Sequence, residues 1–316
     1  MSKMFQRAGV IIASVLIAAT QLLSAQIPVI IDTDLDSDVD DVAALAMALN
    51  LHKQNKINIL GVVVTSDDPF APVCASAINQ YFGFPDLPIA FDKQQPKLTN
   101  YSRYTKQISD SFPHTLASFD MAEEPVQLYK RLLANAQDTS VVIVTLGHLS
   151  SLQAIMKSEG GSDLIHTKVN KWICMGGMFP IGKEANFYRP DSSSTVYCVE
   201  NWKRPVTFCG WEAGNQVLSG GASFKTMSTE SSPVFRGFRL YNNFAGRPSW
   251  DQLAILMLTE TGSEYFELIS NGICKVDSDG TNHWIEGPAA NQSYIKLKQN
   301  ADKKKLIATI DHLTLK

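Results

Sequence analysis

The segment from Pro28 to Asp41 reads Pro-Val-Ile-Ile-Asp-Thr-Asp-Leu-Asp-Ser-Asp-Val-Asp-Asp. Its apolar start has the composition of a short buried strand, and six carboxylates follow within the ten residues that begin at Asp32. The next residues, 42–49, are rich in Ala and Leu and favour a helix without a break. The acidic stretch is therefore predicted to be a strand-to-helix loop at the carboxyl edge of a parallel sheet, where α/β enzymes place their sites.

Three explanations of this acidic loop compete. An EF-hand loop counted from Asp32 needs Gly at its sixth position and Glu at its twelfth, where this chain has Ser37 and Ala43. An acidic helix start, which complements the helix dipole, explains the last two carboxylates but not the first two at the strand end. Clustered carboxylates repel one another, and a hard cation among them removes that cost. We therefore favour a divalent-metal site, with the acidic helix start as the alternative.

The remainder of the chain predicts one α/β domain over residues 26–316. Helical segments such as Val126–Gln137 and Ser151–Lys157 alternate with strands to the end of the chain, and no linker or repeat interrupts them. This order predicts a mostly parallel, open Rossmann-like sheet with helices on both faces. The strand candidates are Val29–Asp32, Ile57–Thr65, Val141–Leu146, Lys171–Met175 and Val206–Cys209.

Residues 1–25 have the pattern of a secretory signal peptide. Lys3 and Arg7 precede an apolar run over residues 10–19, and Ala25 offers a small residue for cleavage. The run is shorter than a spanning helix needs, although Leu23 lies where a small residue is preferred and leaves an uncleaved anchor open. We expect export to a periplasm or outside the cell, with no membrane association after cleavage.

The net charge and the cysteine content limit the partners and the disulfides that we expect. The formal net charge is −3 at pH 7, which gives no electrostatic footprint for nucleic acid. None of the five cysteines has the two-residue spacing of a metal site, and apolar surroundings favour buried free thiols. We expect no obligatory disulfide and keep a Cys198–Cys209 pair as the minor alternative.

Several segments, in order along the chain, resemble the inosine-uridine-preferring nucleoside hydrolase family, calcium enzymes that cleave the N-glycosidic bond of ribonucleosides. The family opens with Asp-Thr-Asp, a loop and Asp-Asp, which Asp32-Thr33-Asp34 and Asp40-Asp41 match, although the loop here is two residues longer. The later matching segments are Val141–Leu152, with His148 in place of a family Pro, then Met175-Gly176-Gly177, Glu184-Ala185-Asn186 and Trp250-Asp251. The similarity runs from Pro28 to at least Leu258, and the tail beyond carries no placed motif.

The resemblance implies a nucleoside hydrolase-like fold and a calcium site. Asp34 would bind the metal and act as the catalytic base that takes the proton from the attacking water. Asp41 would be a principal calcium ligand, the carbonyl of Leu146 would complete the metal shell, and Asp251 would supply a distant carboxylate. Without the resemblance, Asp251 also fits as the cap of a helix over Gln252–Thr259.

The resemblance also assigns the substrate contacts. Asp40 would accept a ribose hydroxyl, and Glu184 and Asn186 would grip the ribose. Supporting positions go to three residues: Asp32 in the acidic loop, Asp68 near the metal, and His148 in the loop after Leu146.

Trp250 bears on the departing base. Many relatives have His before the late Asp, and that His can protonate the base, whereas an indole donates no acidic proton. Purine-preferring relatives stack a Trp there, which implies purine nucleosides; the alternative is that Trp250 packs the pocket wall. Phe70 or Tyr81 would provide a second aromatic face.

The function implied by the resemblance is calcium-dependent hydrolysis of ribonucleosides to free base and ribose, for nucleoside salvage. The expected partner is a small-molecule nucleoside, with a homo-oligomer open. Two alternatives remain: a catalytically weak nucleoside- or sugar-binding protein on the same scaffold, and a hydrolase of another riboside.

Overall fold

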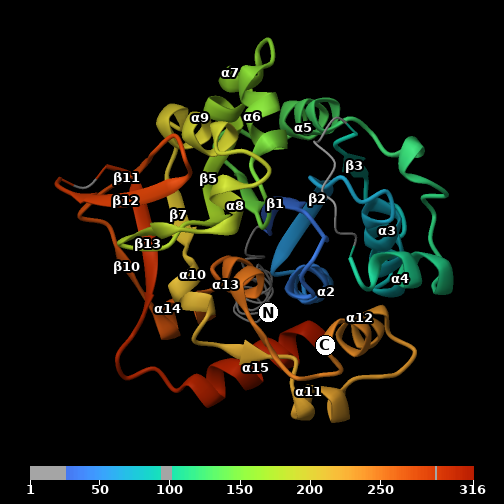
Figure 1. Cartoon of the computed structure of the whole chain (residues 1–316). Helices are drawn as coiled ribbons and strands as arrows, with labels where there is room; N and C mark the ends of the chain where they lie inside the picture. Colours follow the sequence, from blue (N-terminus) through green and yellow to red (C-terminus); the bar gives the residue numbers. More distant parts are fainter. Residues whose placement is uncertain (1–25, 94–101, 289) are drawn as a thin grey trace, which may run out of the picture.

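The computed structural model describes residues 26–93, 102–288 and 290–316, so the expected signal peptide lies outside the described residues. An eight-stranded sheet in the order β10-β13-β7-β5-β4-β1-β2-β3 forms the centre of the molecule (Figure 1). The β10–β13 pair is antiparallel, and the other neighbours are parallel. The strands are β1 (Ile27–Thr33), β2 (Ile57–Val64), β3 (Ile89–Phe91), β4 (Val141–Thr145), β5 (Val169–Met175), β7 (Val206–Cys209), β10 (Phe266–Ile269) and β13 (Gln292–Leu297).

Continuous apolar runs explain the parallel strands. Every residue of β4 and β7 is buried, because a parallel sheet is covered on both faces. Successive side chains of β1 alternate between the faces: Val29 and Ile31 join one hydrophobic core, and Ile30 joins the other. The five strands expected from the sequence are confirmed, with ends that differ by up to two residues.

Helices form a layer on each face of the sheet (Figure 1). One layer contains α5 (Pro125–Ala134), α6 (Ser150–Lys157), α7 (Gly161–Lys168) and α9 (Ser193–Asn201). The other contains α2 (Asp40–Lys53), α3 (Ala71–Tyr81), α13 (Trp250–Leu256) and α15 (Lys303–Leu315). The remaining helices are α4 (Thr105–Ser111), η1 (Phe119–Met121), α8 (Ala185–Tyr188), α10 (Trp211–Gly214), α11 (Ala222–Met227), α12 (Pro233–Asn242) and α14 (Glu260–Tyr265).

The C-terminal region departs from the expected alternation, which is wrong beyond α14. Four strands, β10 to β13, follow one another without a helix. Of these, β11 (Gly272–Val276) and β12 (Thr281–Glu286) join β6 (Ile181–Lys183) in a separate antiparallel sheet. Their buried residues alternate with more exposed ones, so no continuous apolar run marks them in the sequence. A third, two-stranded sheet pairs β8 (Leu218–Ser219) with β9 (Arg247–Pro248).

All five cysteines are buried and free, so the alternative Cys198–Cys209 disulfide is wrong. Within the described ranges, no helix combines the length and apolar character that a membrane crossing requires.

Candidate active site

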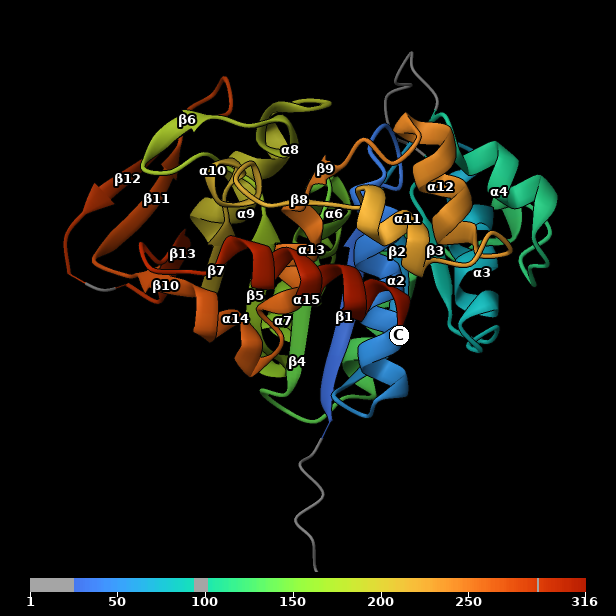
Figure 2. The same cartoon turned by 90° about the horizontal axis from the view of Figure 1, so that it is seen from below.

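A cavity of about 310 Å³ lies at the carboxyl edge of the central sheet. Its walls come from the loops after β1, β4, β5 and β7 and from the start of α13, elements that meet above the strand ends in Figure 2. Nine of the residues expected at the site line it: Asp34, Asp40, Asp41, Leu146, His148, Glu184, Asn186, Trp250 and Asp251. Segments more than 200 residues apart in the sequence therefore contribute to one cavity.

Hydrogen bonds hold Asp41 at the start of α2. Its Oδ1 accepts from Thr33 Oγ1 at 2.5 Å and from Leu35 N at 3.2 Å. Leu35 has a φ of 44°, and this left-handed conformation turns the chain sharply after β1. Burial raises the pKa of Asp41, and the bonds from Thr33 and Leu35 oppose that rise.

Close packing against Gly147 positions Asp34. A Cβ added to Gly147 would lie 2.8 Å from Asp34 Cβ, too near for any larger residue without movement. The glycine after Leu146 therefore leaves space for the carboxylate. Burial, and then the neighbouring charge of Asp41, raise the pKa of Asp34 well above its usual range.

The acidic residues at the cavity repel one another. Burial, followed by the charges of Asp41 and Asp40, raises the pKa of Asp251 well above its usual range. Asp251 lies inside the first turn of α13, whose N-cap is Ser249, so the interpretation of Asp251 as the helix cap is wrong. Burial, with the charges of Asp68 and other neighbours, raises the pKa of Asp36 to about 7.

The donor set fits a hard divalent cation. Asp36 Oδ1 is buried without a hydrogen-bond partner, and the cavity presents several carboxylate oxygens, the ligand type that Ca²⁺ prefers. In the part of the chain that the structure describes, however, no three His, Cys, Asp or Glu side chains are grouped closely enough to hold a metal ion. The residue types at the cavity thus suit a metal ion, whereas their positions in the described structure do not form a complete ligand shell.

Asp32 and Asp68 lie behind the cavity wall, since neither lines it. Asp32 accepts hydrogen bonds from Thr65 Oγ1 at 2.5 Å and from Tyr129 Oη at 2.7 Å, which connects β1 to its neighbours. Asp68 accepts from Thr105 Oγ1 at 2.6 Å. Both carboxylates are therefore placed to fix loops around the site rather than to contact a ligand in the cavity.

Asn186 and Glu184 form a connected pair at the start of α8. Asn186 Nδ2 donates to the Leu146 carbonyl at 2.8 Å. The Glu184 carboxylate accepts from Asn186 N at 2.9 Å and from Gly177 N at 3.1 Å, so it caps the helix and fixes the Met-Gly-Gly strand end. Burial raises the pKa of Glu184 to about 7.

His148 is 4% exposed, and neither ring nitrogen has a hydrogen-bond partner in the described structure. Burial lowers the pKa of His148 to about 4. The imidazole is consequently neutral at pH 7 and presents one donor and one acceptor to the cavity wall.

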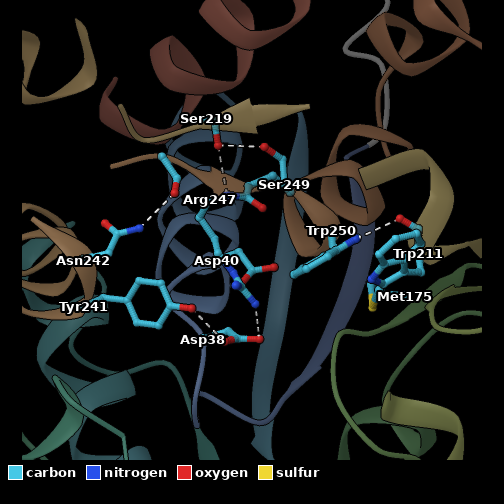
Figure 3. A network of polar contacts seen from close by, with 12 residues as sticks. Asp38, Asp40, Met175, Trp211, Ser219, Tyr241, Asn242, Arg247, Ser249 and Trp250 are labelled. Atoms are coloured by element: carbon cyan, nitrogen blue, oxygen red, sulfur yellow. Dashed lines mark hydrogen bonds and ion pairs between the residues drawn. The ribbon is translucent and has the colours of Figure 1, made fainter. Parts of the chain in front are cut away.

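Two further aromatic residues line the cavity beside Trp250, namely Tyr188 and Trp211, and the sequence predicted neither of them there. Trp250 Nε1 donates to the Trp211 carbonyl at 2.9 Å, and the two ring centroids lie 6.4 Å apart at 29° (Figure 3). Neither Phe70 nor Tyr81 lines the cavity, so the expectation that one of these two residues provides the second aromatic face is wrong.

Three basic residues, Lys183, Arg189 and Arg247, also line the cavity, and the sequence predicted none of them there. Of these, Arg247 pairs with carboxylates of the acidic loop. Its guanidinium pairs with Asp38 at 2.5 Å and Asp40 at 3.6 Å, and lies 4.6 Å from the Trp250 ring centroid (Figure 3). One indication was present in the sequence, because Asp38 belongs to the lengthened loop and its extra negative charge needed a partner.

The comparisons with known proteins agree with this fold. The family model for inosine-uridine preferring nucleoside hydrolase matches residues 29–312. The chain therefore belongs to the inosine-uridine preferring nucleoside hydrolase family, whose members hydrolyse ribonucleosides. No curated protein sequence matches the chain.

Solved structures share the fold at low identity. A plant nucleoside hydrolase, PpNRh1, has a TM-score of 0.70 at 14% identity, over 91% of this chain and 98% of its own. An inosine-uridine preferring nucleoside hydrolase from Bacillus anthracis has a TM-score of 0.70 at 13% identity, over 92% and 99%. An inosine-guanosine nucleoside hydrolase has a TM-score of 0.68 at 15% identity, over 91% and 98%.

Proposed function

We propose that this family member is a calcium-dependent nucleoside N-ribohydrolase that prefers purine nucleosides. One observation carries the proposal: carboxylates from two segments far apart in the sequence, Asp34 and Asp41 in the acidic loop and Asp251 in α13, line a single cavity with Asn186 and Trp250. Buried carboxylates repel one another, and a divalent cation is the simplest compensation.

The residues at the cavity have separate roles in the proposed reaction. Asp34 is the base that takes a proton from the water attacking the anomeric carbon. Asp40 accepts a hydrogen bond from a ribose hydroxyl. Asn186, fixed by its bond to the Leu146 carbonyl, contacts the ribose from the other side.

The calcium ion would be held by Asp34, Asp41, Asp251 and the Leu146 carbonyl, and when bound it supplies positive charge that favours ribose hydroxyl binding and water activation. The amide of Asn186 already occupies one acceptor direction of that carbonyl, whose second lone pair remains for an ion. The shared Leu146 carbonyl would therefore link the ribose-binding side chain of Asn186 to the metal site.

The purine preference rests on Trp250. Its ring lies at the cavity beside Trp211, and an aromatic wall gains more contact from a two-ring base than from a pyrimidine. Because His148 is neutral at pH 7, stacking and substrate positioning replace an acidic donor in assisting departure of the base.

A nucleoside panel tests the proposal. The mature chain, residues 26–316, is incubated with inosine, guanosine, adenosine, uridine or cytidine, and free ribose is measured. Each assay is made before chelation, after chelation and after calcium is restored. We expect purine hydrolysis that chelation abolishes and calcium restores. Substrate binding without ribose release would instead support the binding-protein alternative, and activity that resists chelation would contradict the calcium assignment.

Export is a separate proposal, and it rests on the basic, apolar and small-residue pattern of residues 1–25. Expression of the full chain in a bacterium, followed by N-terminal sequencing of the protein in the periplasm and medium, tests it. A mature N-terminus at Gln26 is expected. Full-length protein that remains inside the cell would contradict it.

A further inference from the structure

Arg247 is a fixed cation beside the carboxylates of the acidic loop. Two other basic side chains line the same cavity: Lys183 pairs with Asp279, and Arg189 lies over the Tyr188 ring.

The backbone of Arg247 pairs with Ser219 in the two-stranded sheet, and its side chain is 20% exposed. The guanidinium lies between two aromatic residues, 4.6 Å from the Trp250 ring centroid and 5.4 Å from that of Tyr241. The Tyr241 hydroxyl also donates to Asp38 at 3.0 Å, so the ring and the ion pair support each other (Figure 3).

The contacts of Arg247 divide the carboxylates into two groups. Asp38 and Asp40 face the guanidinium at 2.5 Å and 3.6 Å. Across the described ranges, Asp34, Asp41 and Asp251 have no ion pair with Lys or Arg, although they line the same cavity. One group is therefore compensated by the protein itself, and the other is left for an external cation.

We propose that Arg247 is a positioning residue with two effects on the site. It holds Asp40 toward the ribose, and as a built-in counter-cation it weakens binding of the divalent ion and keeps Asp38 and Asp40 from serving as additional ligands. This inference rests on the proposed metal-dependent function and assigns a role to a residue outside the expected set.

The geometry explains why an arginine performs this role. A planar guanidinium can address two carboxylates and lie on an aromatic face simultaneously, whereas a lysine ammonium is a point charge on a flexible stem. The two contacts with Asp40 and Trp250 connect the ribose-binding carboxylate to the base-binding wall. Loss of Arg247 should therefore disturb substrate positioning while it strengthens attraction for cations.

Calcium binding tests the electrostatic half. Chelator-treated protein is titrated with CaCl₂ by calorimetry at about 0.15 M salt, where charges separated by more than about 8 Å are largely screened. Arg247→Met should bind calcium about ten- to a hundredfold more tightly, because a positive charge close to the ion is removed. Arg247→Lys keeps the charge and should remain within about threefold of the unmodified protein.

Two further variants are the controls. Arg103 is exposed, donates to the Tyr241 carbonyl at 3.1 Å and does not line the cavity, so Arg103→Met should leave calcium affinity within about twofold. The double variant Arg247→Met with Asp38→Asn removes the ion pair as a unit and guards against misfolding of the single variant. Since the local charge is then unchanged, its calcium affinity should return to within about threefold of normal.

Kinetics at saturating calcium test the positioning half. Arg247→Met should lose at least about tenfold in kcat/KM despite its tighter metal binding, and Arg247→Lys should lose activity without any gain in calcium affinity. Equal or weaker calcium binding by Arg247→Met, in a protein that binds calcium when unmodified, would overturn this inference alone. Absence of calcium binding by the unmodified protein would overturn the metal half of the proposed function as well.

Discussion

The carboxylates of the acidic loop have different partners, and these partners separate their roles. Asp32 accepts hydrogen bonds from Thr65 and Tyr129 and lies behind the wall, whereas Asp41 is fixed by Thr33 and Leu35 at the cavity. Asp34 is placed by its packing against a glycine. In the proposed function, neighbouring residues of one short segment would therefore take the separate roles of support, metal ligation and proton transfer.

Substitution of Asp34 tests its assignment as the base. Asp34→Asn keeps the size of the side chain but removes proton acceptance, so hydrolysis should fall by about a hundredfold to ten-thousandfold. Nucleoside binding, measured by equilibrium dialysis, should survive in part. Asp32→Asn is the matched comparison behind the wall and should act mainly on thermal stability. Near-normal turnover by Asp34→Asn would refute the proposed base.

Trp250 lies against the Arg247 guanidinium and is proposed to stack on the base, and kinetics with two substrates can separate these two roles. Trp250→Ala should lower kcat/KM on inosine about ten- to a hundredfold, because a stacked base contributes about 1–3 kcal/mol. The loss on uridine should be smaller. Any loss common to both substrates reports the missing support for Arg247, while the difference between them reports base stacking. Equal losses would mean that Trp250 supports Arg247 and packs the wall without stacking on the base.

At the scale of elements, the sequence predicted the buried parallel strands because continuous apolar runs such as Val141–Thr145 have few alternatives. It did not predict β10 to β13, whose half-exposed antiparallel strands lack such runs. The same limit applies to the site. Motifs identified the cavity carboxylates, but Arg247 and Trp211 reach the cavity through β9 and α10, short elements without a recognisable pattern.

The junction of α2 with α15 is a testable contact between elements. Asn50, which is buried, donates to the carbonyls of Leu313 and Thr314 at 3.0 Å and 3.1 Å, satisfying the free end of α15. Asn50→Ala should lower the free energy of unfolding by about 1–3 kcal/mol and accelerate hydrogen exchange in α15.

The matched control for this junction is Gln54→Ala. Gln54 also donates to a terminal carbonyl, that of Lys316 at 2.8 Å, but the bond is exposed to water. Its loss should change the free energy of unfolding by less than about 0.5 kcal/mol. Similar destabilisation by both variants would show that the buried Asn50 contact stabilises the fold no more than the exposed Gln54 contact does.

For the whole molecule, buried acids should make stability depend on pH. Burial raises the pKa of Glu184 and Glu212 to about 7 and that of Asp311 to about 6. The folded state therefore holds more protons than the unfolded state between about pH 4 and pH 7, and stability falls as pH rises through that window. His148, with its pKa lowered to about 4, acts in the opposite direction but is a single group.

Thermal unfolding of chelator-treated protein checks this dependence. The melting temperature should be highest near pH 5 and fall toward pH 8, and Glu212→Gln should flatten the fall. The amide of the variant can still accept the bond that Phe179 N donates to Glu212 at 2.8 Å. A melting temperature that rises steadily from pH 5 to pH 8 would contradict the prediction.

The direction of β1 has a practical consequence. The strand begins at Ile27 and leads into the acidic loop, whose Asp34 lines the cavity. Figure 2 shows that β1 starts at the edge of the sheet opposite to α8 and β9. The seven extended residues of β1 span roughly 20 Å between the N-terminal end of the strand and the cavity. An affinity tag or a bead attached before Gln26 would therefore leave the cavity entrance open to substrate. A handle joined after Lys316 would instead pull on α15 and its Asn50 anchor. Surface immobilisation for continuous-flow assays should therefore use the N-terminal side.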